Sequence, residues 1–148
     1  MQPHKHLMIA ATIAAVGWWR TGRPTVAAAA LAAGVLPDVD HLVDYAYYYL
    51  RRRHRLILPL HGYEYAAAAA GAALMRGSAP WGVAALSYLV HLLADQAENR
   101  TRPWGYSLIC RAAHGFCIER ISTMPADAKR GRMNDMAALK RLLRRPRK

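Results

Sequence analysis

The sequence predicts an all-α fold, a compact bundle of about six to seven helices. Three observations support this prediction. Hydrophobic residues make up 54% of the chain, and much of this fraction is alanine, as in residues 27–30 and 66–70, which is typical of closely packed helices. Glycine and proline stand mainly at the ends of the apolar segments, where they terminate helices. No segment has the pattern of a convincing strand.

The first three predicted helices are separated by recognisable breaks. The first covers about residues 5–19 and ends at the stretch Thr21-Gly22-Arg23-Pro24. The second covers 25–35, because Leu36 precedes a proline and so leaves the α region. Asp38 is then placed to cap a third helix over 39–53, in which apolar residues recur at helical spacing.

Four further helices follow, over residues 59–75, 81–97, 104–118 and 133–143. Pro59 opens the first of them, and Gly77-Ser78-Ala79-Pro80 ends it. The chain of 148 residues is long enough for a substantial core. We expect one helical domain over residues 1–122, followed by a basic C-terminal helix and tail over 123–148.

The positive charge is concentrated at the C-terminus. The chain has a formal net charge of +12, and residues 129–148, with nine basic residues and one acidic residue, contribute 9 − 1 = +8 of it. Such a segment is suited to nucleic acid or to an anionic membrane surface as a partner. The alternative is a solvated end of the chain without a partner.

The apolar segments favour peripheral or partial membrane association. Each run is shorter than the ~20 residues of a spanning helix, and extension would cross a histidine, which is costly at membrane depth. Trp18-Trp19-Arg20 and residues 47–53, three tyrosines followed by Leu50 and three arginines, combine aromatic and cationic side chains as interfacial belts do. The alternative is helix ends with snorkelling arginines.

Histidines and carboxylates recur on segments that are otherwise apolar. Asp38, Asp40 and His41 fall within four residues at a predicted helix start, and His6 lies near the start of the first helix. Two pairs have helical spacing, and their side chains therefore share a helix face: His91 with Asp95 (i,i+4) and His61 with Glu64 (i,i+3). Together these residues supply four imidazoles and four carboxylates. Because one tetrahedral zinc uses about four ligands, the surplus indicates two ions, or one ion with outer partners.

Each residue taken singly has a simpler interpretation. Asp38 is suited to an N-cap, and His6 to a solvent-exposed position near the terminus. His61 fits a hydrogen-bonded core histidine, and Glu64 fits an ion pair with one of the arginines in 51–55. The segments together favour ligands, because apolar helices rarely each bring a histidine and a carboxylate into a core.

These residues resemble a known family. The stretch Leu36-Pro37-Asp38-Val39-Asp40-His41, with His6, His61 and the segment His91-Leu92-Leu93-Ala94-Asp95, is similar to the YdjM-like family, over about residues 4–118. The resemblance implies an inner-membrane-associated, metal-dependent hydrolase with a fold like that of zinc-dependent phospholipase C and the P1-type nucleases. It also implies a location at the cytoplasmic side of the inner membrane, or in the cytoplasm. The family often has a His-Arg-Gly-x-Thr-His-Ser motif in its middle, whereas here Gly62 follows His61.

We therefore expect a hydrolase of phosphoester substrates that uses a divalent metal, Zn²⁺ in one or two ions, to activate water. The expected ligands are His6, Asp38, His41, His61, His91 and Asp95. Asp40 and Glu64 are expected to be catalytic, as further ligands or as general bases. The arginines Arg51, Arg52, Arg53 and Arg55 are expected to bind the substrate phosphate. The rival hypothesis is a non-catalytic binding module at a membrane surface or on DNA that uses the arginine-rich tail.

Overall fold

The computed structural model describes residues 3–143, and within them it contains helices and no β-strand, which confirms the all-α prediction. The elements, in chain order, are α1 (Pro3–Thr21), α2 (Pro24–Val35), the 3₁₀ helix η1 (Leu36–Asp40), α3 (His41–Arg51), α4 (Tyr63–Arg76), α5 (Ala79–Asn99), α6 (Leu108–Ala113), α7 (Ile118–Ile121) and α8 (Pro125–Leu143).

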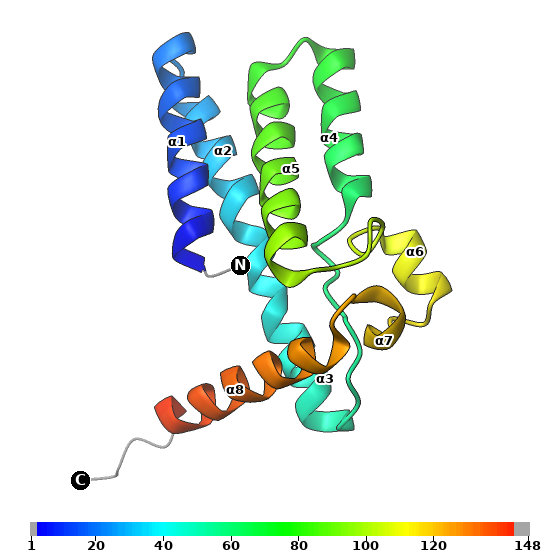
Figure 1. The fold of residues 1–148 in the computed structure, drawn as a ribbon. Helices are drawn as coiled ribbons and strands as arrows, with labels where there is room; N and C mark the ends of the chain where they lie inside the picture. Colours follow the sequence, from blue (N-terminus) through cyan, green and yellow to red (C-terminus); the bar gives the residue numbers. More distant parts are fainter. Residues whose placement is uncertain (1–2, 144–148) are drawn as a thin grey trace, which may run out of the picture.

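Four helices, α1, α2, α4 and α5, stand side by side as an upright bundle, and α5 packs against the other three (Figure 1). Small residues allow these helices to approach closely. At Gly34 in α2, an added Cβ would lie 2.6 Å from both Ala10 Cβ of α1 and Ser87 Oγ of α5. Only glycine fits this three-helix contact, which fixes the height of α2 relative to α1 and α5.

The lower part of the molecule is built below the bundle. Helices α2, η1 and α3 follow one another in nearly one direction, so that α3 extends past the end of the bundle, where α6, α7 and α8 gather (Figure 1). Helix α8 is tied to α3 by a buried ion pair in which Arg132 Nε lies 2.7 Å from Asp44 Oδ2. The junction between the two parts is where the predicted ligands fall.

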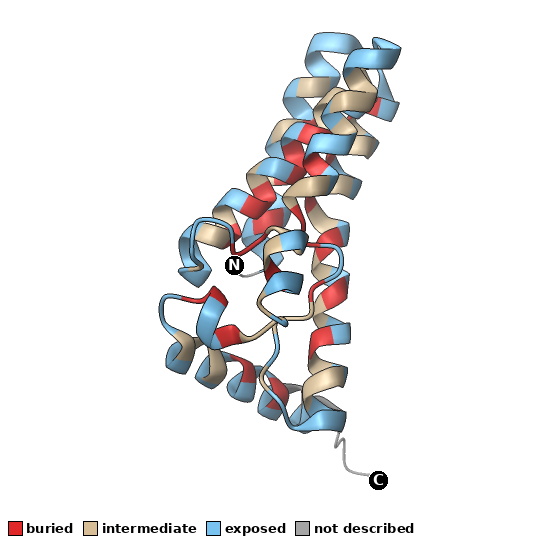
Figure 2. Ribbon diagram, turned by 90° about the vertical axis from the view of Figure 1, so that its right-hand side faces the viewer, coloured by how far each residue is buried: buried red, intermediate tan, exposed pale blue. Residues whose placement is uncertain are grey.

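A small apolar core lies beside this junction. Its buried members come from the loop before α4, from α4 and α5, and from the loop before α6; they are Leu58, Ala66, Tyr88, Leu92 and Tyr106. Figure 2 shows the buried residues on the facing sides of the helices, with exposed residues on their outward sides. The expected ligands next to this core therefore project from helices and loops that are packed against one another.

The outward sides of the bundle carry many large apolar residues. Trp19 is 82% exposed, and Leu74 and Met75 are 86% and 89% exposed. One helical segment of 28 residues, Pro24–Arg51, is long and apolar enough to cross a membrane by length and composition, a test that the core helix of a soluble protein also passes.

Several predicted boundaries were wrong for local reasons. The fourth helix begins at Tyr63 instead of residue 59, because residues 59–62 form an irregular turn in which the Leu60 N–H is bound by Asp40. Of the helix expected over 104–118, only α6 is formed before residue 118; it ends at a turn in which Gly115 and Phe116 have φ near +60°, and α7 begins after this turn. Helix α8 begins at Pro125, eight residues before its expected start at 133. Residues 144–148 of the expected basic tail lie outside the described residues.

Candidate metal centre

The six expected ligands lie together at the junction of the two parts of the molecule. His6 comes from α1, Asp38 from η1, His41 from the start of α3, His61 from the loop before α4, and His91 and Asp95 from α5. They form two groups of four, in each of which one ligand atom per residue lies within 4.8 Å of the others: His6, Asp38, His91 and Asp95, and Asp38, His41, His61 and Asp95. Asp38 and Asp95 belong to both groups, as carboxylates that bridge two cations would.

Asp95 is the most enclosed member of the cluster. One of its oxygens lies 3.0 Å from His6 Nε2, and the other lies 3.2 Å from His61 Nε2. Burial opposes ionisation of this carboxyl, yet the hydrogen bonds from His6 and His61 keep its pKa below the usual value. Asp95 is therefore an anion that joins α1, α5 and the loop before α4.

Asp38 faces the imidazoles without a hydrogen bond. Its Oδ1 lies 3.7 Å from Nε2 of His41 and of His91, and 3.9 Å from Nε2 of His61. Both of its oxygens are buried, and neither has a hydrogen-bond partner in the described structure. A buried carboxylate without a donor is costly, and a cation among the surrounding Nε2 atoms would satisfy it. The donor set of carboxylates and imidazoles fits a divalent metal such as zinc.

Two histidines are oriented so that Nε2 points into the cluster. His91 Nδ1 lies 2.9 Å from the Gly34 carbonyl, and His61 Nδ1 lies 3.0 Å from Asp40. Since these acceptors hold a proton on Nδ1, Nε2 is the ring nitrogen that each histidine would offer to a metal, as in most histidine metal sites. The two Nε2 atoms are only 3.1 Å apart, so a proton or a cation has to separate their lone pairs.

The surroundings of His91 and His61 shift the pKa values of the two rings in opposite directions. Burial lowers the pKa of His91 to about 4, with a contribution from the neighbouring His6. Burial also acts to lower the pKa of His61, but the hydrogen bonds to Asp40 and Asp95 outweigh it and raise the pKa to about 9. Near neutral pH the His61 ring is therefore protonated on both nitrogens, and a metal that binds its Nε2 must displace the proton on that atom.

The remaining predicted site residues lie outside the two groups. Asp40 stands behind His61 and accepts a hydrogen bond from the Leu60 N–H at 2.7 Å. Glu64 is not brought to the cluster; it accepts hydrogen bonds from Ser107 Oγ and the Leu108 N–H at the start of α6. The four arginines of the predicted phosphate site are exposed, and none lines the pocket beside the cluster: Arg51, Arg52, Arg53 and Arg55.

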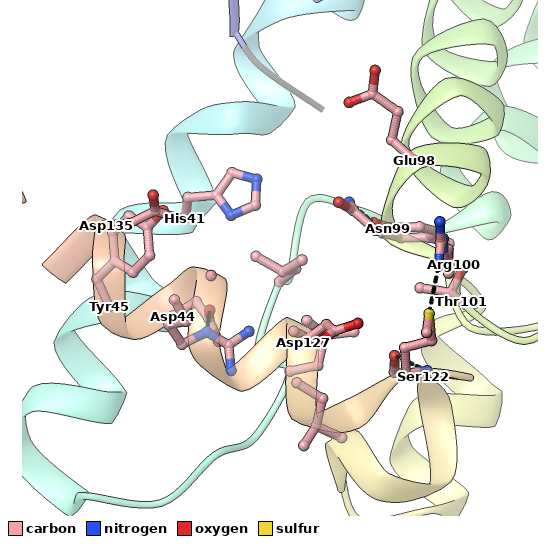
Figure 3. A pocket seen from close by; sticks show the side chains of 18 residues that line it. His41, Asp44, Tyr45, Glu98, Asn99, Arg100, Thr101, Ser122, Asp127 and Asp135 are labelled. Carbon is pink, nitrogen blue, oxygen red and sulfur yellow. Dashed lines mark hydrogen bonds and ion pairs between the residues drawn. The ribbon is translucent and has the colours of Figure 1, made fainter.

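A pocket of about 460 Å³, lined by both polar and apolar side chains, opens beside His41. Figure 3 shows the His41 ring directed toward this space, with Glu98, Asn99 and Arg100 on the opposite wall and Asp127 below. Because His41 also belongs to the second ligand group, and its side chain is 31% exposed, this pocket gives access to the cluster.

Two buried arginines near the site were not expected from the sequence. Arg132 of α8 lines the pocket and pairs with Asp44. Arg111 of α6 is fully buried and donates a hydrogen bond to the His61 carbonyl. Arg132 stands in a run of basic residues and Arg111 stands alone, so neither position carries a spacing pattern that distinguishes it.

The fold and the cluster define an all-α protein with a candidate metal centre at one end of a helical bundle. The chain belongs to the YdjM inner membrane protein family, whose model matches residues 1–109. It is thus a membrane-associated protein, as the resemblance implied. No curated protein and no solved structure matches the chain, and the fold similarity to phospholipase C and the P1-type nucleases stays a prediction.

Proposed function

We propose that the protein is a metal-dependent hydrolase of phosphoester substrates that acts at the cytoplasmic side of the inner membrane. The observation that carries this proposal is the pair of ligand groups that share Asp38 and Asp95. The imidazole and carboxylate donors favour zinc, in one or two ions. Bound there, a divalent cation supplies Lewis-acid activation of water and of a phosphoryl oxygen.

The surrounding residues hold the ligands and receive the substrate. Asp40 fixes the His61 ring, and the Gly34 carbonyl fixes the His91 ring. We assign the substrate to the pocket beside His41. We assign the phosphate contact to Arg100, because Arg100 lines this pocket and the arginines near residue 53 do not.

The proposal is tested with the purified full chain, loaded with Zn²⁺ or Mn²⁺, on a soluble phosphodiester such as bis(p-nitrophenyl) phosphate. We expect hydrolysis that a chelator abolishes and that His91→Ala removes, because this substitution deletes a ligand. Leu93→Ala is the control, since Leu93 lies on the same helix and is 51% exposed. Equal activity in His91→Ala and the wild type, or no hydrolysis by the metal-loaded wild type, would contradict the proposal.

A further inference from the structure

An open apolar groove runs along the upper bundle. Helices α2 and α4 both pack on α5 but scarcely contact each other, and the space between them is a groove over α5. The part nearer the cluster has a volume of about 560 Å³, and none of its lining residues is charged. It merges with a second apolar hollow along α4, because five residues line both: Ala33, Tyr65, Trp81, Ala84 and Tyr88.

The groove leads to the metal centre. Trp81, Ala84, Tyr88, His91 and Asp95 follow one another on α5 at spacings of three and four residues, so the groove floor and the two ligands share one face of that helix. The Tyr88 hydroxyl donates to the Leu60 carbonyl, just before His61.

The lower end of the groove is formed by residues adjacent to ligands. Leu36, Pro37 and Leu60 line it; Pro37 directly precedes Asp38, and Leu60 directly precedes His61. A molecule that fills the groove would therefore end against the two backbone segments that carry Asp38 and His61.

The setting of the groove indicates its occupant. The chain belongs to an inner membrane protein family, and the bundle around the groove presents large apolar residues outward, among them Trp19, Leu74 and Met75. The small alanine side chains on both walls leave the groove open. Because the surrounding bundle surface is apolar, the groove of a bundle placed in a membrane faces hydrocarbon.

We propose that this groove binds one acyl chain of a membrane phospholipid and directs its phosphoester to the His/Asp cluster. This inference rests on the proposed hydrolase function and names its substrate class, a lipid phosphoester. The acyl chain lies between α2 and α4 on the face of Trp81 and Tyr88, and the headgroup lies at Asp38 and His41, the ligands with the most exposed side chains in the second group.

Photo-labelling of the full chain tests the groove separately from catalysis. The protein is reconstituted in vesicles of phosphatidylethanolamine that contain a phosphatidylethanolamine with a diazirine in one acyl chain. We expect irradiation to label the peptides that carry Tyr65, Trp81 and Tyr88. Ala69→Phe, which fills the groove from α4, should remove most of this label. Ala70→Phe is the matched control, because Ala70 is exposed and does not line the groove.

Hydrolysis of the lipid and of bis(p-nitrophenyl) phosphate is measured in parallel. Loss of lipid hydrolysis in Ala69→Phe with retained hydrolysis of the soluble substrate would support the proposal. Label spread evenly over Leu74, Met75 and other outward residues and unchanged by Ala69→Phe would overturn it, as would crosslinks to a second protein copy in place of lipid. Groove labelling without hydrolysis of either substrate would support acyl-chain binding and refute the hydrolase function.

Discussion

At the scale of single residues, the cluster depends on the groups that orient the candidate ligands as much as on the candidate ligands themselves. His91 is held through its Nδ1 by the Gly34 carbonyl, and Gly34 itself lies where α1, α2 and α5 meet. A change at this glycine therefore reaches the candidate metal centre through the backbone, without removing any candidate ligand.

Gly34→Ala should weaken both the fold and the site. The new Cβ would lie 2.6 Å from Ala10 Cβ and Ser87 Oγ, so the helices must separate, at a cost of about 1–3 kcal/mol. We expect a lower thermal midpoint by circular dichroism and a weaker zinc affinity by titration calorimetry.

Gly71→Ala in α4 is the control for that substitution, because no atom lies within 4 Å of the added Cβ. Alanine in place of this helical glycine should stabilise the chain by about 0.4–1 kcal/mol. Unchanged zinc affinity in Gly34→Ala would show that the three-helix contact does not hold His91.

At the scale of elements, helical periodicity was sufficient for the bundle and insufficient for the segments below it. The spacing of His91 and Asp95 correctly placed their two side chains on one face of α5, because a regular helix fixes the directions of its side chains. His61 and Glu64 were expected on one helix face, but His61 lies in the turn before α4 and Glu64 lies in its first turn. Local turns, set by tertiary hydrogen bonds such as that from the Leu60 N–H to Asp40, carry no period that a sequence pattern could show.

Glu64 caps α6 from another helix, and this role gives a pH dependence. Burial opposes its ionisation, but hydrogen bonds from Ser107 and the backbone of Leu108 outweigh it and lower the pKa from 4.5 to about 2. Because the folded-state pKa is below the unfolded value, the cap contributes stability above about pH 4.5, and this contribution is lost as pH falls toward 2.

Glu64→Ala should therefore lower the free energy of unfolding by about 1 kcal/mol at neutral pH, and the difference from the wild type should shrink between pH 4.5 and 2. Urea unfolding at a series of pH values measures this. Glu98→Ala, at an exposed carboxylate paired with Lys5, should change the stability little. A Glu64→Ala deficit that persists undiminished at the lowest pH would show that capping by the ionised carboxylate is not its cause.

At the scale of the whole molecule, the basic C-terminal segment is partly structural. Composition alone suggested a tail, whereas Arg132 and Met136 are buried and Arg132 pairs with Asp44 beneath the pocket. No sequence pattern shows which of the nine basic residues becomes buried when the chain folds. For this reason Arg132 was not expected to line the pocket beside His41. The division of the chain at residue 122 stays a prediction.

Arg132→Met should destabilise the protein by about 3–5 kcal/mol, because it leaves the Asp44 carboxylate buried without its partner. The matched control is Arg130→Met, since the Arg130 side chain is 75% exposed and lies 4.0 Å from an exposed Asp127; exposed pairs of this kind contribute about 0–1 kcal/mol. Thermal unfolding followed by circular dichroism compares the two variants. Equal midpoints would mean that α8 is not anchored through Asp44.

Elemental analysis of the purified full chain, after loading with zinc and dialysis, measures whether the His/Asp cluster holds metal. We expect stoichiometric zinc in the wild type. Asp95→Asn should lose nearly all of it, because Asp95 belongs to both ligand groups. His41→Ala should lose only the part bound by the second group. Asp135→Asn is the control, because Asp135 lines the pocket beside His41 but belongs to neither ligand group. This variant should retain the zinc content of the wild type. A wild type that binds no zinc, or an Asp95→Asn variant with the wild-type content, would mean that the cluster is not a metal site.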